Sequence, residues 1–501
     1  MLFWNDDISK DTQGLDILGI RALDQRLEAN LVNGITTVSQ RGRYFSILPW
    51  AIHQFYSTAL AEGGKFEGAK LGAYLHRVEF LTIAASLSDP VGKAGVGLLG
   101  SDVYSDQMKK LGEGKPVDFP SSKGSRMLGT YYAPSKAIGL LDDGATKNGI
   151  PYLLTARGLE VWAARNEHLD GSSLLTLLWS GGTISQEDAE LAISQFSLSG
   201  LDANSSEAKA LRLAFTTPWQ TPAKYSAAIE RRYASFNATR YWLGAQIKEG
   251  PAGANRILSR NLQACSAGGF TKTASNEWAE FEWRRRQHYA LELLLASACA
   301  ILNDVGALST DEIIEVVRQS TGNGGELESI WPDAQSAWEK TAKAAVESIP
   351  TELMQGQPLP FPQFRALKAA EKMLAAFALL GALEKQSRPF RKVDLDQPLS
   401  STSDLALKLV ARAGDAPFRT LLRELLENCA LLPHLKVTLR KMSNGLKCSL
   451  RFFPDGEKLR LTANQSEAGF SGSRLDNTLG IMADIGILGR NDEGSLIAVA
   501  V

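Results

Sequence analysis

Tyr289-Ala-Leu-Glu-Leu-Leu-Leu-Ala-Ser-Ala-Cys-Ala-Ile-Leu302 is one of the longest apolar runs in this chain of 501 residues. Wound into a helix, the run carries apolar side chains on every side, which is typical of a helix at the centre of a bundle. It is too short to cross a bilayer, which requires about 20 apolar residues. The run therefore predicts a buried core helix in a soluble protein.

Helical periodicity continues on both sides of this run. The clearest helices are predicted over residues 225–247, 276–304, 310–318, 327–346 and 361–384. The last of these has one apolar stripe at three- and four-residue spacing, as expected of a helix that packs on a core. The stripe consists of Leu367, Ala370, Leu374, Phe377, Leu380 and Leu383. No repeat of fixed period is visible, which argues against a solenoid.

A first segment with the order of a winged-helix module follows residue 126. Residues 150–154 predict a strand, and Thr155 is placed to cap a helix that runs through Trp162. The residues before this segment, 89–125, are rich in Gly, Asp, Ser and Pro and predict mostly irregular structure.

A second such segment ends the chain. Residues 435–442 and 446–453 alternate as strands around Ser443-Asn-Gly445, whose Asn-Gly pair is a strong hairpin signal. A third strand is predicted over residues 458–462, followed by a short helix that ends at Gly486 and a last strand over residues 496–501. This order is typical of the end of a winged-helix domain.

The predicted fold is mainly α (α+β), a central helical bundle flanked by winged-helix-like modules. The boundaries are an N-terminal helical domain over residues 1–125, a winged-helix-like segment over 126–180, a helical domain over 181–386, a linker over 387–402 and a C-terminal winged-helix-like module with basic strands over 403–501.

The balance of charges and the spacing of the cysteines indicate the compartment and the kinds of partner to expect. The 54 basic and 55 acidic residues give no overall field toward nucleic acid or membrane, so any anionic partner must be bound by a local patch. The cysteines, Cys265, Cys299, Cys429 and Cys448, show no C-x-x-C spacing, which fits a reducing compartment. The acidic N-terminus lacks the features of a signal peptide. We expect a cytoplasmic protein without a membrane partner.

Motifs of catalysis and of cofactor binding are incomplete. Gly95-Val-Gly-Leu-Leu-Gly100 matches G-x-G-x-x-G but lacks the preceding strand that a dinucleotide fold requires. Cys429, His434 and Cys448 match no familiar zinc spacing. Pro454-Asp455 is a turn rather than a nuclease motif, because Asp-Gly follows the proline. The sequence thus predicts no catalytic residue, cofactor or metal.

Basic residues gather near the C-terminus. Between residues 431 and 460 they outnumber Asp455 and Glu457 by five, and such charge on hairpins often contacts phosphates. The alternatives are a solvated face or a face docked on an acidic partner protein. The predicted nucleic-acid-binding residues here are Lys436, Arg440, Lys441, Lys447, Arg451, Lys458 and Arg460.

Two further arginine groups have a plainer alternative. Arg41 and Arg43 could bind phosphate, or stack on Tyr44 and Trp50 and fix that helix. Arg284-Arg-Arg286 lies beside Glu280 and Glu282, and intrahelical ion pairs explain that run better than a ligand does.

The segment from Leu18-Gly19-Ile20 through Gly34-Ile-Thr-Thr-Val-Ser-Gln-Arg-Gly-Arg-Tyr-Phe-Ser-Ile-Leu-Pro-Trp50 resembles the N-terminus of uncharacterised bacterial families. Those families look like non-catalytic members of multi-gene anti-phage defence and restriction loci, such as an accessory component of a Druantia-like locus. The C-terminal stretch over residues 474–488 is similar in style. No catalytic residue carries over.

The resemblance implies a non-catalytic DNA-binding or scaffolding component of a bacterial anti-phage defence complex. Its expected partners are DNA and proteins encoded in the same locus, including a helicase or a nuclease. Two alternatives stay open: a nuclease-type effector with an unrecognised active site, and a pure protein-docking subunit.

Overall fold

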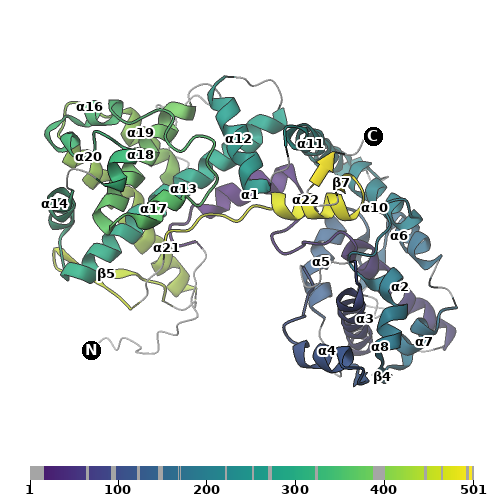
Figure 1. Cartoon of the computed structure of the whole chain (residues 1–501). Coiled ribbons are helices and arrows are strands. Elements are labelled where there is room, and N and C mark those ends of the chain that lie inside the picture. Colours follow the sequence, from purple (N-terminus) through teal and green to yellow (C-terminus); the bar gives the residue numbers. More distant parts are fainter. Residues whose placement is uncertain are drawn as a thin grey trace. The chain divides into compact units, whose positions relative to one another are not determined.

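The computed structural model is mainly helical, with four small two-stranded antiparallel sheets among the described residues (Figure 1). The structure describes residues 16–63, 67–91, 97–120, 125–144, 151–167, 169, 171–219, 223–250, 253–268, 273–321, 325–387, 401–444, 448–463, 467–491 and 496–498. The chain forms two compact units. Unit 1 comprises residues 1–28 and 255–472, and unit 2 comprises residues 29–254 and 473–501. Both units are discontinuous in sequence, a division that the boundaries drawn from the sequence do not follow.

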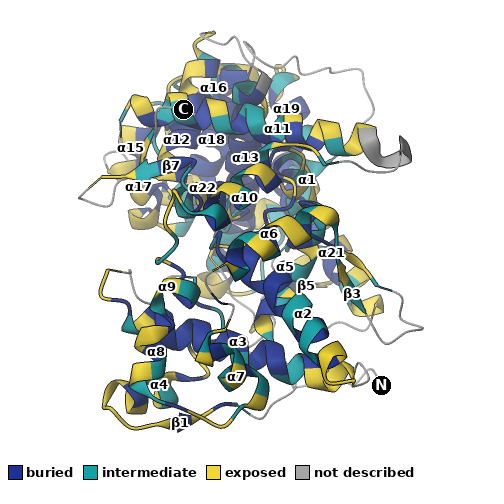
Figure 2. Ribbon diagram, turned by 90° about the vertical axis from the view of Figure 1, so that its right-hand side faces the viewer, coloured by how far each residue is buried: buried dark blue, intermediate teal, exposed yellow. Residues whose placement is uncertain are grey.

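Unit 1 is built around two packed helices, α13 (Thr273–Val305) and α18 (Ala369–Ser387). Figure 2 shows α18 buried along most of its length, and every residue from Met373 to Glu384 is buried. Among the described residues, Ala274–Val305 is long and apolar enough to cross a membrane, yet 72% of its most apolar window is buried inside the protein. The predicted central helix is therefore confirmed as a core helix.

Shorter elements of unit 1 surround this pair. They are α12 (Ala254–Ser266), α14 (Thr310–Ser320), α15 (Glu326–Ile330), η2 (Ser336–Glu339), α16 (Ala342–Glu347), α17 (Pro362–Ala366), α19 (Thr402–Ala411), α20 (Phe418–Leu425), η3 (Leu426–Leu431), α21 (Leu432–Ser443), β5 (Phe452–Asp455) and β6 (Lys458–Leu461). The continuous helix predicted over residues 327–346 is wrong, because Pro332 forces Trp331 into an extended conformation and ends α15.

The predicted hairpin around Asn444 is also wrong. Residues 432–443 are helical, continuing α20 and the π-helical η3. Leu435, Val437 and Leu439 alternate as in a strand, but the buried residues are Pro433, His434, Val437 and Thr438, which follow a helical spacing. The hairpin forms later, where β5 pairs with β6 across Gly456-Glu457. Gly456 has φ 64°, a conformation that glycine adopts without strain.

Unit 2 is a helical assembly with three of the small sheets. Its elements are α2 (Tyr44–Ala61), α3 (Gly68–Ser88), α4 (Ser105–Gly112), β1 (Val117–Asp118), α5 (Arg126–Ala137), β2 (Leu141–Asp143), β3 (Tyr152–Leu154), α6 (Ala156–Asn166), α7 (Ser173–Ser180), β4 (Thr183–Ile184), α8 (Gln186–Leu191), α9 (Ile193–Phe196), α10 (Ser206–Thr216), α11 (Ala223–Lys248), α22 (Leu475–Asp484), β7 (Leu488–Arg490) and β8 (Leu496–Ala498). The first helix, α1 (Arg21–Leu31), begins in unit 1 and ends in unit 2.

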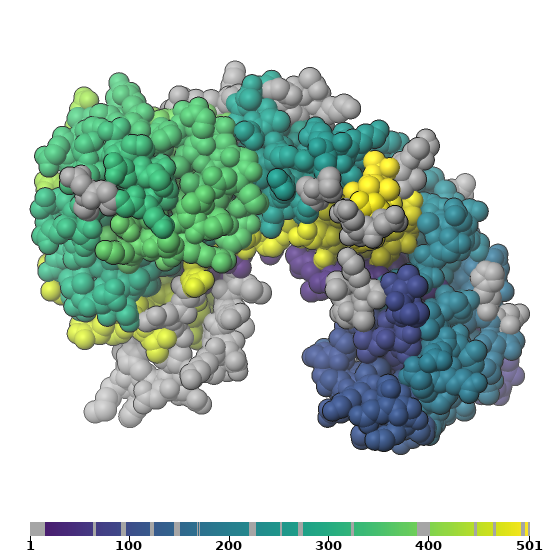
Figure 3. Space-filling model, viewed as in Figure 1, coloured from purple at the N-terminus to yellow at the C-terminus, as the bar shows by residue number. Residues whose placement is uncertain are grey.

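Local sequence signals in unit 2 are largely confirmed. The Thr155 side chain caps α6 by accepting a hydrogen bond from Gly158 N, and β3 lies where a strand was predicted. α22 ends before Gly486 and is followed by the β7–β8 pair. The strand β8, in the yellow part of Figure 3, lies against the teal residues of α11. The predicted linker falls almost wholly on residues 388–400, which lie outside the described residues.

Candidate functional site

The structure separates the basic residues that the sequence grouped on strands. Lys436 and Arg440 lie on the exposed face of α21, whereas Lys458 and Arg460 lie on β6. Lys458 Nζ pairs with Glu312 at 3.4 Å, and Arg460 Nη2 pairs with Asp455 at 2.8 Å. Lys447 lies outside the described residues. The idea of basic strands is therefore corrected to a basic helix with a separate, charge-compensated hairpin.

Lys441 and Arg451 are turned toward the protein. Lys441 Nζ donates to the carbonyl of Asp16 at 2.8 Å, and partial burial lowers the pKa of Lys441. Arg451 is only 8% exposed, and burial lowers the pKa of its guanidinium. Lys441 therefore lies on the side of α21 that packs against the protein, and Arg451 lies beneath α21, so neither belongs to its outer face.

The outer face of α21 combines charge with exposed apolar surface. Leu432, Lys436, Leu439 and Arg440 follow one another at the spacing of one helical face. Leu432 is 44% exposed and Leu439 is 57% exposed. Among the residues that the structure describes, the side chains of Lys436 and Arg440 form no ion pair or hydrogen bond. We call Leu432, Lys436, Leu439 and Arg440 the α21 face.

A buried histidine holds α21 in place. His434 Nδ1 lies 3.1 Å from the carbonyl of Ile17, and its Nε2 accepts a hydrogen bond from Arg451 N at 3.0 Å. Burial lowers the pKa of His434 to about 4, so the ring is neutral near pH 7. A neutral ring protonated on Nδ1 satisfies both contacts. His434 thus ties α21 to the segment before α1 and to the residue before β5.

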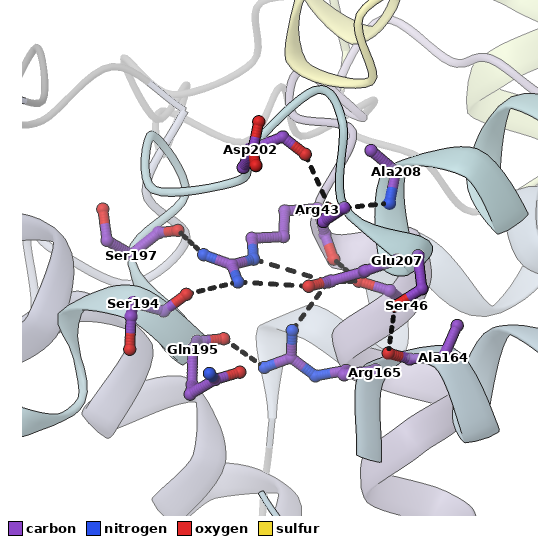
Figure 4. Close-up of polar contacts among 12 residues, drawn as sticks. Arg43, Ser46, Ala164, Arg165, Ser194, Gln195, Ser197, Asp202, Glu207 and Ala208 are labelled. Atoms are coloured by element: carbon purple, nitrogen blue, oxygen red, sulfur yellow. Dashed lines mark hydrogen bonds and ion pairs between the residues drawn. The ribbon is translucent and has the colours of Figure 1, made fainter. Parts of the chain in front are cut away.

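The two arginines predicted near the N-terminus lie in unit 2 and bind protein groups. Arg41 Nε pairs with Asp484 at 2.9 Å, at the end of α22. Arg43 is 2% exposed and pairs with Glu207 at 3.1 Å, while its Nη1 donates to the carbonyl of Ser197 at 2.6 Å. Figure 4 shows Arg43 and Arg165 converging on Glu207. The burial of Arg43 removes it from any nucleic-acid surface.

The residues at the centre of this group escaped the sequence analysis. Arg165 Nη1 lies 2.7 Å from Glu207, and its guanidinium stacks over Trp50, 5.4 Å from the ring centroid. The stacking expected of Arg41 or Arg43 is therefore supplied by Arg165. Although burial opposes ionisation, Arg165 and Arg43 together hold the pKa of Glu207 at about 2. We call Arg43, Arg165 and Glu207 the unit 2 triad.

The intrahelical ion pairs predicted for Arg284-Arg-Arg286 are present in α13. Glu282 pairs with Arg285 and with Arg286, both at 3.0 Å, and all three side chains are 1% exposed. Arg284 pairs with Glu280 at 3.0 Å. We call Glu282, Arg285 and Arg286 the unit 1 triad.

A further cluster of buried acidic and basic side chains lies farther along α13. His288 Nδ1 lies 3.3 Å from Asp24, and His288 Nε2 lies 2.8 Å from Glu292. Burial lowers the pKa of His288, but the two carboxylates outweigh it and raise that pKa. Glu292 also pairs with Arg21 at 3.2 Å. Because these side chains pair with one another and are mostly buried, the cluster forms a structural network.

No group of three or more metal-binding side chains occurs in the described part of the chain. Cys429 is buried, and burial raises the pKa of its thiol to about 12, which disfavours the thiolate that zinc requires. No protein-family model, curated protein or solved structure matches this chain.

Proposed function

We propose that this chain is a non-catalytic scaffolding component of a bacterial anti-phage defence complex, and that it docks a partner protein through the α21 face. The proposal rests on one observation: cationic side chains that have no partner among the described residues share a single helical face with exposed leucines. The partner segment that fits this pattern is an acidic amphipathic helix or strand, because leucines need apolar contacts and the cations need carboxylates.

The apolar half of the α21 face favours protein over DNA as the partner. Phosphate backbones are bound by cations and hydrogen-bond donors, and exposed leucines add nothing to such contacts. A protein partner would bury Leu432 and Leu439, and buried apolar side chains at the centre of an interface contribute most of its affinity.

The biological setting comes from the resemblance of residues 18–50 to defence-locus proteins. A helicase or nuclease encoded in the same locus would supply the catalytic step, and the cytoplasm would be the site of action. The helix–hairpin order of α22, β7 and β8 is compatible with a winged-helix-like module, which we include in the proposal as a second protein- or DNA-contacting element.

The test is a pair of titrations on the full chain. The first ligand is a short synthetic peptide of leucine and glutamate with the leucines at helical spacing, and the second is a DNA duplex of about 20 base pairs. We expect saturable peptide binding that weakens about tenfold in K436E/R440E and about tenfold in L432S/L439S. The charge-matched control K343E/R419E changes exposed side chains elsewhere on unit 1 and should bind like the wild type.

The two double variants distinguish the possible partners. Strong DNA binding that falls in K436E/R440E but not in L432S/L439S would overturn protein docking and favour the DNA-binding alternative. Absence of binding to either ligand would overturn the α21 face as a docking surface. Metal-dependent cleavage of the duplex would overturn the non-catalytic assignment and favour the nuclease alternative.

A further inference from the structure

A cavity of about 980 Å³ lies in unit 1 along α13. The α13 residues that line it include Tyr289, Leu293, Ala296, Ala300 and Asp304, which share one face of the helix. With a rise of 1.5 Å per residue, this face extends for about 22 Å. The opposite walls come from α17 and α18 and from residues 467–470. The volume lies at the upper end of the range of about 300–1,000 Å³ that ligand pockets occupy.

The floor of the cavity is apolar and partly aromatic. Tyr289 lies between Phe364 and Phe470, with ring centroids 6.2 Å and 6.1 Å apart respectively. Ala296 and Ala300 are small and leave room above α13, since neither side chain extends beyond a methyl group. Such a floor suits the hydrocarbon or aromatic body of an organic ligand.

The cavity is lined by cations and by carboxylates. Arg365 and Lys372 lie on the α17–α18 wall, and within the described residues neither side chain forms an ion pair or hydrogen bond. Glu467 and Asp304 also line the cavity but form no ion pair with these cations. Burial raises the pKa of the Tyr289 hydroxyl, while Arg365 acts to lower that pKa and Glu467 acts to raise it. The lining therefore carries two cations and two carboxylates, and the α17–α18 wall supplies the cations, neither of which is ion-paired among the described residues.

We propose that this cavity binds an amphipathic organic anion. A carboxylate, sulfonate or phosphate group lies against Arg365 and Lys372, and the apolar body lies against Tyr289, Phe364 and the alanines of α13. The proposal is independent of the α21 face, because the two sites share no residue, and either can fail without the other.

Two fluorescent probes of nearly equal shape test the proposal. One is 1-anilinonaphthalene-8-sulfonate, which is anionic, and the other is N-phenyl-1-naphthylamine, which lacks the sulfonate. We expect one saturable site on the full chain, with the anionic probe bound about tenfold more tightly. R365Q/K372Q should weaken binding of the anionic probe about tenfold and leave the neutral probe within about twofold.

Two further variants test whether the charge must line the cavity and whether the probes occupy the cavity. K368Q removes an exposed charge from the same stretch of chain without touching the cavity lining, and should bind both probes like the wild type. A300W projects an indole ring into the cavity and should weaken binding of both probes. Ala300 is only partly buried, so we expect A300W to fold. An unfolding temperature equal to that of the wild type would show that the fold is intact. Unsaturable binding, or an anionic probe indifferent to R365Q/K372Q, would overturn the proposal.

Discussion

Each unit buries one carboxylate between two arginines, but the two triads are assembled differently. In unit 1, Glu282, Arg285 and Arg286 all lie on α13 and pair at three- and four-residue spacing. In unit 2, Arg43, Arg165 and Glu207 come from three distant segments of the chain. The first triad is therefore formed by one helix, whereas the second exists only when α2, α6 and α10 are packed together.

The arginines of both triads then hold backbone carbonyls. In unit 1, Arg285 donates to Ser471 O at 2.9 Å, and Arg286 donates to Met354 O at 2.8 Å. In unit 2, Arg43 donates to Ser194 O at 2.6 Å. A buried arginine that is paired with a carboxylate can thus also hold a neighbouring segment through its backbone carbonyl. In the sequence alone, such an arginine is indistinguishable from one that binds phosphate.

The largest expected effect is that of E207Q on unit 2. The substitution leaves Arg43 and Arg165 buried without a counter-charge, which costs about 3–5 kcal/mol in similar cases. Because the triad joins segments distant in sequence, hydrogen exchange should accelerate in α2, α6 and α10 together. Thermal unfolding and exchange followed by mass spectrometry measure both effects. Faster hydrogen exchange confined to α10 would contradict the role of Glu207 in holding α2 and α6.

E282Q should act more locally in unit 1. We expect a loss of about 3 kcal/mol, at the lower end of the range for broken buried pairs, because both arginines keep their carbonyl acceptors nearby. Exchange should rise around Met354 and around Ser471, the segments that Arg286 and Arg285 hold, while α13 itself stays protected. Faster exchange in unit 2 would show that the triads are not independent.

A third prediction concerns acid sensitivity beneath α21. The pKa of His434 is lowered to about 4 from an ordinary value of 6.5, so the neutral ring stabilises the fold above pH 6.5 and that stability is lost as pH falls toward 4. At pH 5 the loss is about 2 kcal/mol. H434Q, which keeps a donor and an acceptor but does not titrate, should flatten the curve of unfolding free energy between pH 6.5 and 4. An unchanged slope would exclude His434 as its source.

The smallest effect on stability is expected from the α21 face. K436E/R440E alters exposed side chains without partners among the described residues, so its unfolding free energy should stay within about 0.5 kcal/mol of the wild type. Chemical denaturation measures this directly. A loss comparable to that of E207Q would place these charges inside the fold and contradict their assignment to a docking surface.

Local signals explain what could be predicted. The pairs of α13 follow from spacing alone, and so does the cap of α6 by Thr155. Glu207 gave no signal, because its partners lie 164 and 42 positions away and nothing in its neighbourhood marks it as buried. The fold class followed from helical periodicity, whereas the division into two discontinuous units depends on long-range packing that no window of sequence contains.

The α21 face could not be predicted because the sequence around it was assigned the two-residue period of a strand. Alternation of Leu435, Val437 and Leu439 matches a strand, and a strand would have buried Leu439 with the others. In the helix, His434 and Val437 lie on the buried side, whereas Leu432 and Leu439 lie on the exposed side. No start signal marks α21, because α21 continues α20 and η3 without a break and Pro433 lies inside this run.

The most direct test of the account is protection from phage by the complete locus that carries this gene. Efficiency of plating should fall with the wild-type locus and return to the level of cells without the locus when K436E/R440E is introduced, at equal protein level and unfolding temperature. The control K343E/R419E should protect like the wild type. Full protection by K436E/R440E would contradict the proposed docking through α21, and absence of protection by the wild-type locus would contradict the proposed defence function.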